Sequence, residues 1–145
     1  MNNSELEKKI LNIVTEVVDQ KGFVSSIDIL SRLGYLSQID CEDWRKGKIE
    51  YLEKVCQVNL GKLTTINRIL RQVSGKMKLK PSWTAYNKFG KGPKMRLRFS
   101  KSGEESIEKA YSTHYVNEYR LNQLNELKRN PIPDENKNHQ QVTSL

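Results

Sequence analysis

Residues 78–99, KLKPSWTAYNKFGKGPKMRLRF, change the periodicity of the chain and decide the fold that we expect. Apolar and polar residues alternate in both KLKPSWTAY and KMRLRF, and this twofold pattern is typical of β-strands. The NKFGKGP between them is too long for a tight two-residue turn. The stretch therefore predicts a β-hairpin with a long, glycine-containing loop.

The same alternation predicts which side chains of the hairpin face the core. Those expected to point inward are Leu79, Trp83, Ala85, Met95, Leu97 and Phe99. Those expected to point outward are Lys78, Lys80, Ser82, Thr84, Tyr86, Lys94, Arg96 and Arg98. Pro81 favours the edge of a sheet for the first strand, because proline cannot donate a ladder hydrogen bond.

Helical spacing dominates the sequence before the hairpin. Apolar residues recur every three or four positions over residues 4–20, 26–33, 48–58 and 59–74, which predicts four helices. The capping signals are Ser4 with Glu7 for the first helix and Asn59 for the fourth, with Gly22 and Gly75 as the stops. Residues 23–24 are expected to be extended, and residues 35–47 to form a loop with one short turn capped by Asp40.

A last helix is predicted to start near Gly103, where Ser102 and Glu105 form a capping-box pattern, and to run to about residue 128. Residues 130–145 carry prolines, amides and charges with almost nothing to bury, so we expect a disordered tail. The sequence thus predicts an α+β fold: a single, mainly helical domain over residues 1–129 with a basic β-hairpin and a C-terminal helix, followed by the tail.

Positive charge is concentrated in the middle of the chain. The net charge of the 145 residues is +8, but residues 54–103 contain 13 Lys and Arg and no Asp or Glu. The rest of the chain holds 12 basic and 17 acidic residues, a net charge of −5. Such a block produces a local positive potential that attracts a polyanion.

Several functional classes find little support. No run approaches the roughly 18 apolar residues of a membrane span, and the N-terminus lacks a signal-peptide pattern, so we expect a cytoplasmic protein without membrane contact. Two cysteines without a CxxC pair and two histidines do not indicate a zinc site. The acids between Asp40 and Glu53 have no nuclease spacing. We therefore expect no metal, no cofactor, no catalytic residue and no enzyme activity.

The order helix, short strand, helix, further helices and then a hairpin resembles a winged-helix domain. The resemblance covers residues 4–99 and includes KGFVSSIDILSRLG, which looks like the first part of a helix-turn-helix. It implies DNA binding, with either 48–58 or 59–74 as the recognition helix. The segments PSWTAY and RLRFSKSGEESIEKAY also resemble small uncharacterised bacterial proteins, which implies no activity.

These observations favour a regulatory or accessory protein that binds DNA or RNA, mainly through phosphates. The residues expected to contact nucleic acid are Arg68, Arg71, Tyr86, Lys88, Lys91, Lys94, Arg96, Arg98 and Lys101, with Tyr86 stacking on a base. The alternative is a protein-interaction module whose basic face docks an acidic partner. The simplest interpretation is a solvent-exposed strand face without a partner, but it does not explain why residues 54–103 contain no Asp or Glu. DNA versus RNA, and a homodimer, are left open.

Overall fold

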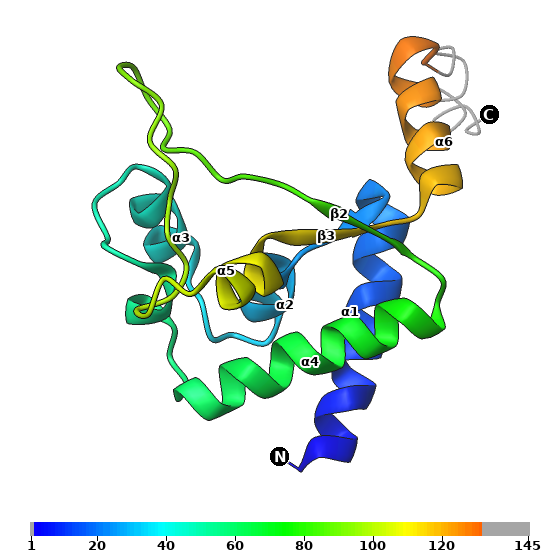
Figure 1. The fold of residues 1–145 in the computed structure, drawn as a ribbon. Helices are drawn as coiled ribbons and strands as arrows, with labels where there is room; N and C mark the ends of the chain where they lie inside the picture. The colour runs from blue at the N-terminus through cyan, green and yellow to red at the C-terminus, as the bar shows by residue number, and fades with distance from the viewer. Residues whose placement is uncertain (1, 132–145) are drawn as a thin grey trace, which may run out of the picture.

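The computed structural model describes residues 2–131, which form six α-helices and a three-stranded antiparallel sheet (Figure 1). The elements in chain order are α1 (Asn3–Lys21), β1 (Phe23–Val24), α2 (Ser26–Arg32), α3 (Gln38–Arg45), the 3₁₀ helix η1 (Leu52–Val55), α4 (Leu60–Lys76), β2 (Lys80–Trp83), α5 (Glu105–Ser112), β3 (Thr113–Val116) and α6 (Glu118–Arg129). The α+β class expected from the sequence is confirmed. The predicted tail, residues 130–145, lies almost entirely outside the described residues.

Helix α1 forms where its apolar periodicity predicts it. Its buried stripe runs from Leu6 to Val18, and its N-cap is Asn2 in a capping box with Glu5, not Ser4 as expected. Gly22 ends it at a φ of +85°, a conformation that costs a β-carbon-bearing residue about 1–2 kcal/mol. The chain then turns at once into the predicted extended pair, which is β1.

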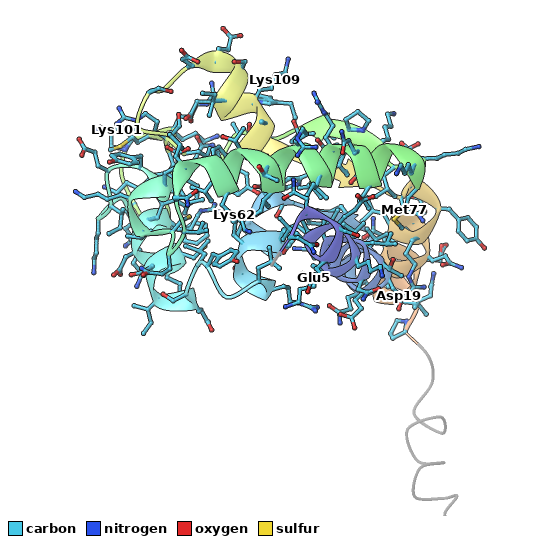
Figure 2. The ribbon with its side chains drawn as sticks, turned by 90° about the horizontal axis from the view of Figure 1, so that it is seen from below. Glu5, Asp19, Lys62, Met77, Lys101 and Lys109 are labelled. Carbon is cyan, nitrogen blue, oxygen red and sulfur yellow. The ribbon has the colours of Figure 1, made fainter. Side chains whose placement is uncertain are left out.

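Helix α4 also matches its prediction, and it packs against α1. The Asn59 side chain caps it by accepting a hydrogen bond of 2.8 Å from the Lys62 backbone N–H. Its inner face buries the predicted apolar residues Leu63, Ile66, Leu70 and Val73. Gly75 does not stop the helix, which continues to Lys76; the chain turns instead at Lys78, whose φ is +60°. Figure 2 shows α4 lying across the molecule between α1 and α5.

The predicted helix over residues 48–58 is wrong, since only the short η1 forms there. The backbone N–H groups of Leu52 and Glu53 donate to the carbonyl oxygens of Arg98 and Phe99, at 3.2 and 2.9 Å. These long-range bonds hold residues 52–53 against residues 98–99. Upstream, the expected loop with a short turn is the helix α3, capped by Ser37 instead of Asp40.

The sheet has β3 at its centre, with β1 and β2 on either side. Tyr115 of β3 pairs with both Val24 and Pro81. Pro81 therefore lies on an edge strand of the described sheet, as predicted. The single helix expected over residues 103–128 is wrong, because β3 divides it into α5 and α6. Thr113, Tyr115 and Val116 are β-branched or aromatic residues, which suit a strand better than a helix.

The predicted second strand, residues 94–99, is not part of the sheet. An isolated bridge between Asn87 and Arg96 is its only β-pairing among the described residues. The expected inward positions of Leu97 and Phe99 are confirmed, whereas Met95 is 51% exposed. Residues 87–96 form an irregular hairpin that projects beside α3 and well apart from α4 (Figure 1).

Two aromatic side chains of the first predicted strand lie on the opposite side from the one expected. Trp83 is 48% exposed, because every residue of β2 faces solvent. Tyr86 is buried against Trp44 and Phe99, with ring centroids 5.9 and 5.1 Å away. The chain leaves the sheet after Trp83, so the twofold pattern does not persist as far as Tyr86.

Candidate nucleic-acid interface

Most cations of residues 54–103 form no ion pair with the other described residues. Of these 13 side chains, Lys76 pairs with Glu7 at 3.6 Å and Lys80 with Glu118 at 3.4 Å. Within residues 2–131 the other eleven form no ion pair. A surface that only has to stay soluble could carry acidic and basic side chains together. The folded protein therefore keeps the positive potential that the sequence indicates.

Helix α4 contributes an outer face without any acidic residue. Thr64, Arg68 and Arg71 are exposed on it. Asn67 lies deeper, where its side-chain oxygen accepts a hydrogen bond from the Ser26 hydroxyl and ties α4 to α2. The exposed residues are of types that reach phosphates or base edges.

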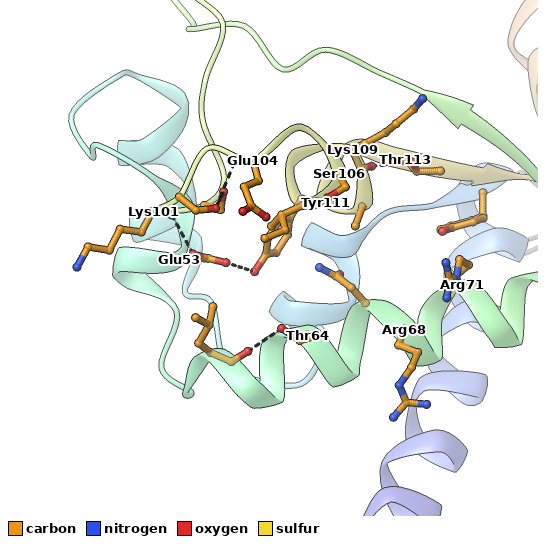
Figure 3. Close-up of a pocket in the computed structure, with 17 residues that line it drawn as sticks. Glu53, Thr64, Arg68, Arg71, Lys101, Glu104, Ser106, Lys109, Tyr111 and Thr113 are labelled. Atoms are coloured by element: carbon orange, nitrogen blue, oxygen red, sulfur yellow. Dashed lines mark hydrogen bonds between the residues drawn. The ribbon is translucent and has the colours of Figure 1, made fainter.

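A groove of about 900 Å³ lies between α4 and α5 (Figure 3). Its α4 wall includes Thr64, Arg68 and Arg71, and its α5 wall includes Lys109 and Ala110. The exposed, apolar Leu60 and the half-buried Ile107 also line it, together with Lys101 from the basic stretch. Apolar side chains thus line the groove together with four cations, Arg68, Arg71, Lys101 and Lys109.

The end of this groove is fixed by a hydrogen-bonded glutamate. Glu53 accepts a bond of 2.7 Å from the Tyr111 hydroxyl and one of 3.0 Å from the Lys101 backbone N–H. Burial raises the pKa of Tyr111 above its ordinary value, and the hydrogen bond to Glu53 raises it further. The tyrosine therefore stays neutral and keeps donating to Glu53.

Glu108 fixes the adjacent backbone from the other side. One of its carboxylate oxygens accepts from the Phe99 N–H at 2.9 Å, and the other accepts from the Ser100 N–H at 2.7 Å and from the Ser100 hydroxyl. The Trp44 indole N–H donates to the carbonyl of Arg98 at 2.8 Å. Residues 98–101 are thereby held rigidly at the mouth of the groove.

The hairpin carries a second, separate group of cations. Lys88, Lys91 and Lys94 are exposed in it. Its base is held by Arg45, whose guanidinium lies 4.0 Å from the Phe89 ring centroid and 5.0 Å from that of Tyr86. The hairpin is therefore attached to α3, not to α4.

Arg96 and Arg98 lie between the two groups. The Arg96 guanidinium is 4.8 Å from the centre of the exposed Trp83 ring. Arg98 lies 5.5 Å from the Tyr51 ring centroid and donates from Nε to the Ser100 carbonyl at 3.0 Å. Both side chains are exposed but oriented by their aromatic neighbours.

The structure thus brings together only part of the predicted interface. Arg68, Arg71 and Lys101 meet at the groove, whereas the hairpin lysines do not reach it. Tyr86 is 8% exposed, and its hydroxyl is hydrogen-bonded to His114 Nε2 at 2.7 Å. The expectation that Tyr86 faces outward and stacks on a base is therefore wrong, because the ring is part of the core.

Two residues of this surface escaped the sequence analysis. Lys109 lies outside residues 54–103, the acid-free block, and lines the groove only because of where α5 packs. Trp83 was expected in the core because of the twofold pattern around it. The acid-free block signalled the region, but no local signal indicates that these two side chains belong to it.

The remaining reactive groups do not gather into a catalytic or metal site within residues 2–131, where no three His, Cys, Asp or Glu side chains are placed to hold a metal. His114 stacks on Phe23, with ring centroids 4.9 Å apart, and its pKa is lowered by burial. Burial raises the pKa of the Cys56 thiol to about 12 and also raises that of Cys41. None of the described helices has the length and apolar character needed to cross a membrane.

Comparison of the chain with protein-family models, curated proteins and solved structures finds no match. Functional inference therefore depends on the geometry and charge of the surface described above.

Proposed function

We propose that this protein binds nucleic acid through its phosphate backbone, as a regulatory or accessory factor. The observation that carries the proposal is the set of eleven basic side chains without an ion pair among the described residues. Phosphate binding requires several cations at short spacing, because affinity comes from neutralising successive phosphates and releasing their counterions. The four cations that line the α4–α5 groove support the proposal on this ground.

The resemblance of residues 4–99 to a winged-helix domain, taken from the sequence, supports the same proposal. Helices α1, α2 and α4 and the strands β1 and β2 keep the expected order, whereas β3 takes the place in the sheet that was expected for residues 94–99. Because residues 48–58 are not an α-helix, α4 is the remaining candidate for the recognition helix. The departure from a simple winged pattern is the long connection between β2 and β3, which contains the irregular hairpin and α5.

Fluorescence anisotropy tests the proposal with labelled duplex DNA, single-stranded DNA and RNA at several salt concentrations. We expect binding to weaken steeply with salt, with the logarithm of affinity falling by about 0.7–0.9 per phosphate contact for each tenfold rise in salt. Absence of binding to all three probes at low salt would refute the proposal.

Charge-reversal pairs identify the surface that is used. Arg68→Glu with Arg71→Glu removes groove cations, and Lys91→Glu with Lys94→Glu removes hairpin cations. The matched control is Lys8→Glu with Lys9→Glu, since both lysines are exposed on α1, outside the acid-free block. We expect the first pair to weaken binding most. Equal effects of all three pairs would point to net charge alone.

A second candidate function is docking of an acidic protein segment. It is favoured by the apolar part of the groove, where Leu60 is 61% exposed. Polyglutamate distinguishes the two functions in the same assay. If the protein binds nucleic acid, polyglutamate should compete only weakly with an oligonucleotide. If the protein docks an acidic protein segment, polyglutamate should bind and the oligonucleotide should not.

A further inference from the structure

We propose that the α4–α5 groove binds a single nucleic-acid strand, with its bases directed into the groove and its phosphates along the rim. This inference rests on the proposed function, because it names the form of nucleic acid that the same surface takes. It differs from the mode that a recognition helix implies, in which α4 would enter the major groove of a duplex.

The position of α5 is the first argument. The major groove of B-DNA is about 12 Å wide, and an α-helix with its side chains is about 10–12 Å across, so a reading helix fills it alone. Here the exposed face of α4 is one wall of a groove whose other wall is α5, and Arg68 and Lys109 both belong to its lining. A duplex that received α4 would meet α5 with its backbone, whereas a single strand fits between the two helices.

The distribution of charge within the groove is the second argument. The apolar side chains of Leu60, Ile107 and Ala110 line it. In Figure 3 the charged groups of Lys101 and Lys109 point away from the middle of the groove, towards its rim. Single-stranded nucleic acid presents unpaired apolar base faces and a charged backbone, and this arrangement of apolar walls and cationic rim is complementary to it.

A path out of the groove leads to an exposed aromatic side chain. Lys109 also lines a second hollow of about 760 Å³, on the other side of α5, together with Trp83 and Arg96. Trp83 is 48% exposed, and the Arg96 guanidinium lies 4.8 Å from its ring centre. Because the Arg96 guanidinium lies over one face of the ring, an unpaired base can stack on the other face or on the guanidinium plane. A strand that passes Lys109 can therefore bind in both hollows.

The carboxylates around this path do not close it to a polyanion. Glu53 and Glu108 accept hydrogen bonds from Tyr111 and from the backbone at residues 99–101, so their charge is directed into the protein. Glu104 and Glu105 are exposed near the N-terminus of α5. Opposed to them are the cations Arg68, Arg71, Lys101 and Lys109 of the groove and Arg96 and Arg98 of the second hollow.

The protein itself provides a reporter for the test. Trp44 is fully buried and Trp83 is the other tryptophan of the chain, so contact quenching of tryptophan fluorescence by a base reports on Trp83. The probe is an oligonucleotide of about 15 nucleotides, within the site sizes of single-strand-binding folds, used alone and annealed to its complement. Anisotropy of a labelled end gives the affinity of each form.

We expect the single strand to bind about tenfold more tightly than its duplex and to quench the tryptophan emission. Trp83→Ala should weaken single-strand binding by about tenfold and remove the quenching. Ala110→Phe fills the groove from an exposed position and should weaken the single strand selectively, whereas Asn12→Phe on the outer face of α1 is the matched control.

The outcomes separate this inference from the proposed function. Tighter binding of the duplex, unchanged by Ala110→Phe, would overturn the single-strand mode and leave nucleic-acid binding standing. Binding of neither form, or of polyglutamate alone, would overturn both. Single-strand preference that is lost in Ala110→Phe and kept in Asn12→Phe supports the groove as its site.

Discussion

We expect Glu108→Gln to destabilise the protein, because this carboxylate supports the backbone that carries Lys101 to the groove. Its two oxygens accept three hydrogen bonds from Phe99 and Ser100. The side chain is only partly exposed, so water does not replace these bonds freely. Glutamine has nearly the same shape but one acceptor oxygen and a donor amide, so the change tests the hydrogen bonds and not the packing.

The magnitude follows from the bonds that glutamine cannot make. With its oxygen turned towards Ser100, its amide group faces the Phe99 N–H, and two donors then oppose each other. A hydrogen bond to a charged group contributes about 1.5–3 kcal/mol, and a neutral one about 0.5–1.5 kcal/mol. The loss of one bond and of charge from the others gives a decrease of about 2–3 kcal/mol in the free energy of unfolding. For a chain of this size the midpoint of thermal unfolding falls by roughly 5–10 °C.

Thermal and urea unfolding, followed by circular dichroism, measure the effect. The matched control is Glu105→Gln, which removes the same charge from an exposed position of the same helix. An unchanged midpoint in Glu108→Gln, or an equal decrease in both variants, would refute the reasoning. A decrease confined to Glu108→Gln supports the carboxylate as the anchor of residues 99–101.

Three further predictions concern the groove, the end of α1 and the core. Glu104→Gln should raise the affinity for an oligonucleotide by roughly two- to fivefold in anisotropy, because it removes a carboxylate that lines the groove; a lower affinity would contradict this.

Gly22→Ala should lower the free energy of unfolding, measured in urea, more than Gly34→Ala does. Both glycines have a positive φ, but a β-carbon at Gly22 would lie 2.7 Å from Leu121 Cα, whereas one at Gly34 would meet open space. Equal decreases in the two variants would exclude the contact between Gly22 and α6. Stability should fall as pH drops below about 6.5, since the half-buried His114 has a lowered pKa and the unfolded chain binds more protons there. His114→Gln should flatten the pH dependence of the unfolding midpoint. An equally steep pH dependence in this variant would show that His114 is not the group responsible.

The elements that local chemistry dictates could be predicted from the sequence. The apolar periodicity of α1, its stop at Gly22 and the Asn59 cap of α4 each depend on residues a few positions apart. Such signals act within one or two turns of the chain, so no knowledge of the fold is needed to read them.

The central strand β3 could not be predicted in this way. Its pairing partners, Phe23–Val24 and Lys80–Trp83, are remote in sequence, and the apolar residues around Tyr111 and Tyr115 also fit a helical pattern. The opposite error occurred at residues 94–99. There the alternation arises because Leu97 and Phe99 are buried, with Phe99 packed on Trp44, although the only β-pairing of this segment among the described residues is the isolated bridge between Asn87 and Arg96. Tertiary contacts thus decided both segments against their local pattern.

For the candidate site, too, composition could be read from the sequence, whereas the arrangement of the residues in space could not. The acid-free block identified the basic residues, because a charge count needs no coordinates. It could not separate the groove cations from the hairpin lysines, since Lys101 and Lys91 look alike in sequence. It also missed Lys109 and Trp83, whose place depends on where α5 and β2 lie.

The two groups of cations should contribute unequally to binding, because they differ in how firmly they are held. Backbone hydrogen bonds to Glu53 and Glu108 fix Lys101 and its neighbours, and α4 fixes Arg68 and Arg71. Residues 90–94 of the hairpin form no backbone hydrogen bond with any residue from 2 to 131. Ordering a side chain or loop on binding costs about 0.5–1.5 kcal/mol for each immobilised side chain. Cations on a pre-ordered backbone avoid part of this cost, so the groove should determine affinity while the hairpin lysines add long-range attraction that salt screens readily.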